Sequence, residues 1–237
     1  MPYRELDQAN IMTTIEKLKA RISERFPGSG LSKVADELVR IGNEVLVTVK
    51  YLGEPNWAIR IPVIIAILLI VVLAGIAMTK ANPSADLSGW GTIESGISNV
   101  VFVGIAIVFL LSIETKIKRR RALRMIHQLR TVAHVVDMHQ LTKDPERLTS
   151  PAPDTESSPE RTMTSVQLGR YLDYCSEMLS VTSKLAALLV QRFSDEVILD
   201  AVNDIETLTT GLSGKIWQKI RLIDRPRGAG DKARTLD

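Results

Sequence analysis

The chain has 237 residues, of which 45% are hydrophobic and 24% charged, with a net charge of +3 and one cysteine. These averages resemble those of a soluble domain, but residues 61–79 and 97–113 contain no Asp, Glu, Lys or Arg. This uneven distribution excludes a simple soluble enzyme domain and a disordered chain, and one cysteine excludes a disulfide scaffold.

Residues 1–56 are predicted to form an N-terminal cytoplasmic helical hairpin. Apolar residues recur at helical spacing on both sides of a Pro-Gly-Ser-Gly break at 27–30. Ser32 is the expected N-cap of the second helix, because its hydroxyl can accept from a backbone N–H of the first turn.

The first transmembrane helix is predicted at about 57–79. It contains eighteen consecutive residues, from Ile61 to Met78, that are apolar or tolerated in a membrane, which is long enough to span a bilayer. Trp57 and Arg60 lie where an interfacial anchor and a snorkelling cation are expected. A buried helix of a soluble protein is the competing interpretation, and the absence of a polar face disfavours it.

A second transmembrane helix is predicted at 97–113, joined to the first by a short external loop at 80–96. Its apolar core is only twelve residues long, so in isolation it is also compatible with a re-entrant or core helix. Because this segment follows a stronger first span, we interpret it as the second helix of a two-span hairpin. Small or polar residues that would allow the two spans to pack closely are Gly75, Asn99 and Gly104.

The distribution of Lys and Arg predicts the orientation of the hairpin. The external loop carries one basic residue, Lys80, whereas a cluster follows the second span: Lys116, Lys118, Arg119, Arg120, Arg121 and Arg124. The positive-inside rule therefore puts both termini in the cytoplasm, in a multi-pass protein of the cell (inner) membrane. The cluster is interpreted mainly as a topology signal with attraction to anionic lipid headgroups, and no nucleic-acid partner is expected.

The C-terminal half is predicted to be helical on both sides of a linker. A stalk helix is expected at 114–141, where apolar spacing also allows coiled-coil packing. A flexible Pro-rich linker at 142–163 is followed by a cytoplasmic helical hairpin at 164–223 and a disordered tail at 224–237. The two cytoplasmic hairpins each have one apolar face, so we expect them to form a four-helix bundle, or else to pair with a second subunit.

The three histidines of the chain all lie on the stalk, and they give the only unusual cluster of polar residues. His127, His134 and Asp137 share one helical face. Of these, His134 and Asp137 could form a proton-sensing or metal-binding pair, or the three simply make a polar face. Two groups are too few for a metal site. Cys175 is interpreted as a core residue rather than a nucleophile. We therefore predict no catalytic residue, no metal and no cofactor.

The fold class predicted from the sequence is an all-α membrane protein. Its function is expected to be non-enzymatic: the cytoplasmic bundle mediates self-association or partner binding, as an anchor, scaffold or sensor. Membrane lipids and either a homo-oligomer or a protein partner are the expected contacts. The layout, in which a cytoplasmic helix, a span hairpin and a long cytoplasmic helix follow in order, resembles SLATT-type membrane effectors of bacterial conflict systems. That resemblance implies the alternative of a pore-forming or channel-like effector.

Overall fold

A computed structural model describes residues 5–80, 90–143, 145, 156 and 163–223, without the side chains of 74, 77–80 and 90–100. Within these ranges every regular element is an α-helix, which confirms the all-α part of the predicted fold class. The predicted tail at 224–237 and nearly all of the predicted linker lie outside the described residues. The chain divides into two compact units, Tyr51–Arg121 and the remainder, which are described separately below.

The N-terminal hairpin consists of α1 (Gln8–Arg25) and most of α2 (Gly30–Gly53). Between the two helices, Gly28 adopts a φ of 68°, which a glycine accommodates without strain. The Ser32 N–H donates to Oγ of Ser29 at 3.2 Å, so Ser29 occupies the capping position that the sequence assigned to Ser32. The Ser32 hydroxyl is instead 3.0 Å from that of Ser23 in α1.

The C-terminal hairpin consists of α6 (Ser165–Arg192) and α7 (Glu196–Ile223). Thr164 begins α6 with a capping box shared with Gln167, and Asp195 caps α7 by accepting from the Ile198 N–H at 3.3 Å. These caps satisfy backbone donors that have no partner inside the helix.

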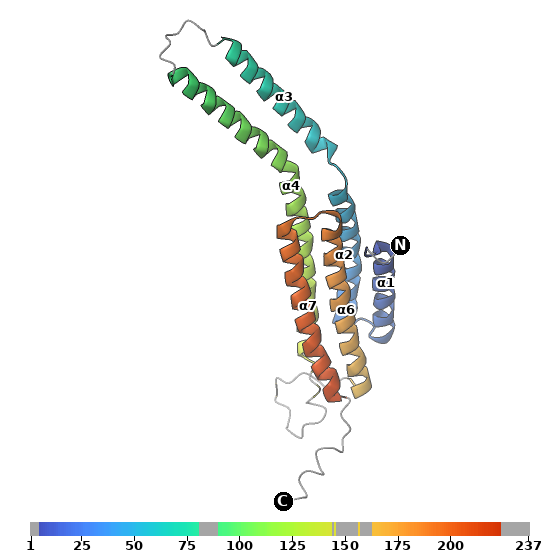
Figure 1. Cartoon of the computed structure of the whole chain (residues 1–237). Coiled ribbons are helices and arrows are strands. Elements are labelled where there is room, and N and C mark those ends of the chain that lie inside the picture. The colour runs from blue at the N-terminus through green and yellow to red at the C-terminus, as the bar shows by residue number, and fades with distance from the viewer. Residues whose placement is uncertain (1–4, 81–89, 144, 146–155, 157–162, 224–237) are drawn as a thin grey trace, which may run out of the picture. The chain divides into compact units, whose positions relative to one another are not determined.

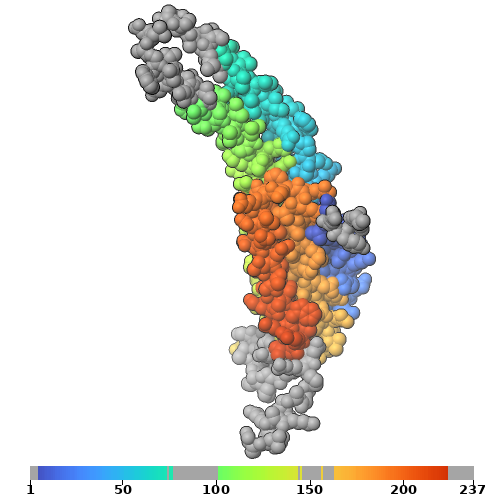
Figure 2. Space-filling view, viewed as in Figure 1, coloured from blue at the N-terminus to red at the C-terminus, as the bar shows by residue number. Residues whose placement is uncertain are grey.

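The bundle unit contains α1, most of α2, the C-terminal part of α4 (Trp90–Leu141), α6 and α7. Figure 1 shows α2, α4, α6 and α7 side by side with α1 beside them, and Figure 2 shows the face formed by α6 and α7. Residues 122–141, predicted as a stalk, are therefore part of the bundle. Fully buried side chains from all these helices form its core, among them Ile15, Leu38, Leu129, Leu179 and Ile205.

Contacts between distant segments hold this bundle together. The Phe26 ring packs edge-on against Tyr171 and Tyr174 of α6, with ring centroids 5.4 and 6.3 Å away. Arg130 of α4 pairs with Asp204 of α7 at 3.0 Å. Ring packing of this kind contributes about 0.5–1.5 kcal/mol per pair beyond area burial, whereas exposed ion pairs contribute less.

The other unit contains α3 (Trp57–Lys80) and the N-terminal part of α4, which run in opposite directions (Figure 1). Half-buried residues recur at helical spacing along each helix, among them Val63, Ile67 and Ile70 on α3 and Val103, Ile107 and Leu110 on α4. Many of the other described apolar side chains of the two helices are exposed. One helical stretch of the described part, Gly30–Leu73, includes an unburied window apolar enough to cross a membrane.

Candidate functional site

Four residues of the α3–α4 unit form a charged cluster, which we call the Glu114 cluster: Asn56, Arg60, Glu114 and Lys118. The Glu114 carboxylate accepts from Nε of Arg60 at 2.6 Å and from the Asn56 backbone N–H at 3.2 Å. Its other ion pair is with Nζ of Lys118, one helical turn away on α4, at 3.0 Å. The Lys118 ammonium also donates to the backbone carbonyls of Leu52 and Glu54, at 3.1 and 2.8 Å.

The two charges of α4 face two helix ends of opposite polarity. Leu52 and Glu54 lie at the C-terminal end of α2, where carbonyls lack a helical partner and the helix dipole attracts a cation. Asn56 precedes α3 and accepts from the Ile59 and Arg60 N–H groups, so Glu114 lies at the N-terminal end of α3, which attracts an anion. Because Glu114 and Lys118 are four residues apart, one turn of α4 places the ammonium at the C-terminal end of α2 and the carboxylate at the N-terminal end of α3.

The environment of Glu114 favours its charged form. Burial raises the pKa of the Glu114 carboxyl, but hydrogen bonds from Arg60, Lys118 and the Asn56 N–H outweigh this effect and lower the pKa to about 2. The side chains of Glu114 and Lys118 are only 15% and 8% exposed. The pair is therefore a charged link that holds the turn between α2 and α3 against α4.

The basic residues predicted to contact anionic lipid separate into two groups. Lys118 is buried, and its ammonium makes the contacts described above. Arg121 lies over the Tyr51 ring, 4.4 Å from the centroid. Three others are exposed, namely Lys116, Arg120 and Arg124, and Arg119 is half-buried.

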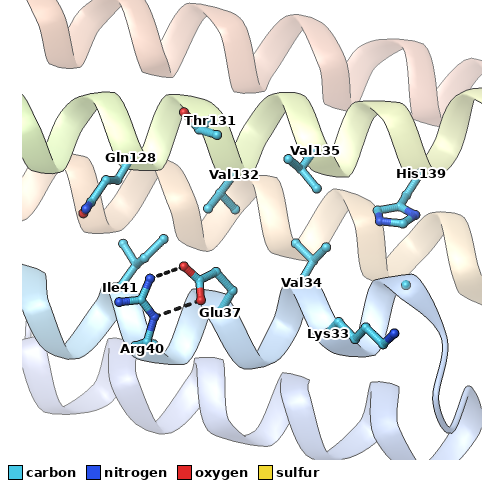
Figure 3. A pocket seen from close by; sticks show the side chains of 11 residues that line it. Lys33, Val34, Glu37, Arg40, Ile41, Gln128, Thr131, Val132, Val135 and His139 are labelled. Carbon is cyan, nitrogen blue, oxygen red and sulfur yellow. Dashed lines mark hydrogen bonds and ion pairs between the residues drawn. The ribbon is translucent and has the colours of Figure 1, made fainter.

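A groove with a volume of about 440 Å³ lies between α2 and α4 in the bundle unit. Figure 3 shows Val34 and Ile41 of α2 facing Val132 and Val135 of α4 across it. Polar side chains line its edges: Lys33, Glu37, Arg40, Gln128, Thr131 and His139. An apolar floor with a polar rim is the usual form of a groove that binds a helical segment.

The two ends of this groove differ in character. At one end the His139 ring lies so close to Gly30 that a Cβ atom on Gly30 would collide with it. Further along, Arg40 donates to both Glu37 and Glu44. The hydrogen bond from Arg40 lowers the pKa of Glu37, so this part of the rim consists of paired charges.

The histidine cluster predicted on the stalk is not assembled into a site. His127 and His134 are exposed, while Asp137 is half-buried and accepts from the Gln140 amide at 2.6 Å. In the described part of the chain, no three His, Cys, Asp or Glu residues gather as metal ligands. His139 does not belong to the helical face that His127, His134 and Asp137 share, and it is the histidine that lines the α2–α4 groove.

The packing role predicted for Gly75 and Gly104 stays a prediction. A Cβ atom on either glycine would meet no described atom within 4 Å. The side chain of Asn99, the third residue of that prediction, lies outside the described residues.

The role of Glu114 was not predicted from the sequence. The i,i+4 spacing of Glu114 and Lys118 was the available signal, because it is typical of a helical ion pair. The helical spacing of the stalk places Gln140 on its apolar face, but it does not predict that the backbone carbonyl of Gln140 accepts from Nζ of Lys219, a residue distant in the chain, at 3.0 Å. Lys219 thereby holds the C-terminal end of α4, as Lys118 holds that of α2.

No protein family, curated protein or solved structure compared with the chain gives a match. The function proposed below therefore rests on the burial, contacts and charge of this chain's own residues.

Proposed function

We propose that the chain is a non-enzymatic, two-span integral membrane protein whose cytoplasmic helical bundle binds a partner protein or a second copy. The observation that carries the proposal is the exposed apolar surface of α3 and α4. Side chains such as Leu68, Phe102 and Val108 are 59%, 68% and 68% exposed, and their neighbours along both helices are similar. Soluble monomers rarely expose apolar patches of this extent, whereas a bilayer would cover them.

The charges at one end of this apolar surface support the proposed topology. Trp57 is 60% exposed, as an interfacial anchor would be. The Glu114 cluster and the exposed Lys116 and Arg120 follow at the level where headgroups would begin. We infer that this end faces the cytoplasm, with both termini there and residues 80–96 outside.

The α2–α4 groove supports the binding role of the bundle. Its floor is apolar and its rim is polar, so an amphipathic helix from a partner or a second copy would bury its apolar face between Val34 and Val135. No arrangement of nucleophile, base and acid accompanies this groove among the described residues, so binding is the role that the geometry supports best.

A pore is the weaker candidate. Ser112 lies near the end of the second predicted span, where it could line the mouth of a pore, but it donates its hydroxyl to the Phe109 carbonyl at 2.7 Å. That bond leaves the hydroxyl satisfied by its own helix. The described face of α4 around it is apolar, and no contact among the described residues favours a water-filled path.

Cysteine accessibility in sealed vesicles tests the membrane part of the proposal. In a Cys175→Ala background, single cysteines replace Ser88 in the loop, Thr14 on α1 and Asp204 on α7. An impermeant maleimide should label Ser88→Cys from one side, and the other two only from the opposite side. Labelling of all three from one side would overturn the two-span topology, and release of the chain by an alkaline wash would overturn membrane insertion.

Site-specific photo-crosslinking in intact cells tests the binding part. A photoreactive amino acid at Val135, in the groove, should give a covalent adduct with a second copy or with one recurrent protein. The same amino acid at Thr14, which is exposed on α1, serves as the control. If both positions give the same adducts or none, while the chain runs as a monomer in mild detergent, the proposed binding role of the groove fails.

A further inference from the structure

An open groove runs along the exposed face of α4 in the α3–α4 unit, with a volume of about 570 Å³. Apolar side chains form its walls, and Gly104 leaves the notch between them. At one end the groove reaches a lysine. The residues that define it are Val101, Gly104, Ile105, Val108, Ser112 and Lys116.

We propose that this groove is a binding site for an anionic phospholipid, with an acyl chain along the groove and the phosphate at Lys116 and Arg120. This inference rests on the proposed function, because it requires α4 to cross a bilayer. It goes further in assigning the ligand class and the residues that bind it.

The length of the groove matches one leaflet of a membrane. From Val101 to Ser112 a helix rises about 16 Å, and half of a typical hydrocarbon core is about 15 Å. Lys116 lies one further turn along, or about 6 Å beyond Ser112. An acyl chain that fills the apolar section therefore brings its headgroup to the level of the cation.

The charges at the end of the groove select an anionic headgroup. Lys116 and Arg120 are both exposed, and the i,i+4 spacing places them on one face of α4, in line with Ser112. The Lys116 ammonium lies 4.7 Å from the centroid of the Phe109 ring, which holds it against the groove. Lys118 and Arg121 point to other partners, as described above, so they do not share this role.

A second copy of α4 fits the groove less well. Close helix pairs in membranes use small residues four apart, so that two backbones can approach. Here Gly104 and Ser112 are separated by two turns, and Val108 stands between them with 68% of its surface exposed. The notch at Gly104 thus accommodates a thin flexible chain more readily than a helix.

Lipid retention by the full-length protein tests the site. The chain is reconstituted into phosphatidylcholine vesicles with or without a minor fraction of phosphatidylglycerol, and retained lipid is measured by native mass spectrometry after mild detergent extraction. Lys116→Gln and Arg120→Gln should each weaken phosphatidylglycerol retention about 5-fold, which corresponds to about 1 kcal/mol per cation. Lys50→Gln, which removes an exposed lysine of α2, should leave it unchanged.

A matched pair of glycine variants tests the groove itself. Gly104→Leu should fill the notch and reduce retention of phosphatidylglycerol, whereas Gly75→Leu on α3 should not. A Cβ atom at either position meets no described atom within 4 Å, and resistance to an alkaline wash checks that both variants insert.

The outcomes separate this site from the proposed function. Protein that inserts and resists an alkaline wash, yet retains both lipids equally in every variant, overturns the lipid site alone. An oligomer that Gly104→Leu converts to monomer also overturns it, since a second copy then occupies the groove. Failure to insert overturns the proposed membrane function as well.

Discussion

Replacing Lys118 with Met tests the reasoning about the Glu114 cluster most directly. The substitution keeps a flexible apolar side chain of similar length but removes the ammonium. Two backbone carbonyls, those of Leu52 and Glu54, then lose their donor. Glu114 loses one of its partners but keeps Arg60 and the Asn56 N–H.

The expected loss of stability is about 3 kcal/mol. A hydrogen bond from a charged donor contributes about 1.5 kcal/mol at the low end of its range, and two such bonds are lost. The 8% exposure of the Lys118 side chain leaves water little access to replace them. The larger values of up to about 5 kcal/mol seen when a buried pair is broken are not expected, because Glu114 remains paired.

Thermal unfolding of the purified chain in a mild detergent measures this effect through tryptophan fluorescence. For a protein of this size a change of 3 kcal/mol lowers Tm by roughly 6–12 °C. Arg124→Met is the control, because Arg124 is exposed on the same helix and such substitutions usually change stability by less than about 0.5 kcal/mol. If the two variants melted at the same temperature, the ammonium would not hold the end of α2, and the reasoning would be refuted.

Three further predictions concern Glu114, Gly30 and Cys175. Because the pKa of Glu114 falls from 4.5 to about 2 on folding, its roughly 3 kcal/mol of stability is present above pH 4.5 and lost toward pH 2; denaturant titrations against pH should show this slope, and Glu114→Gln should remove it. Gly30→Ala should displace the His139 ring and destabilise the bundle by no more than about 1 kcal/mol, the low end of overpacking costs, because the ring is half-buried and can turn away; a double-mutant cycle should show this loss relieved in a His139→Ala background, and additive effects would contradict the contact. Cys175 should react with a thiol reagent only in denaturant, because burial raises the pKa of its thiol to about 12 against a smaller lowering by Lys219; rapid labelling of the folded chain at pH 8 would disprove its burial.

The positions of the helices followed largely from local patterns. The stripe from Ile11 to Ile22 is buried in α1 as its spacing predicts, and α4 ends at Leu141, where the stalk was expected to end. The same helix begins at Trp90 rather than Ile97. Its start was misplaced because apolar periodicity records which residues a membrane or core accepts, and not where helical hydrogen bonding begins.

The amino-acid sequence by itself determined the helical class, the apolar stretches and the breaks between helices, because each of these depends on residues within a few turns of one another. Only the tertiary structure decided which charges face solvent. Lys118 looked like its basic neighbours, yet its ammonium binds Leu52, which lies 66 positions earlier in the chain. His139 likewise acquired its place beside Gly30 through the packing of α2 on α4. A partner so distant in the chain leaves no local pattern. The length and composition of each segment therefore determined the helices, and only their packing determined the surroundings of Lys118 and His139.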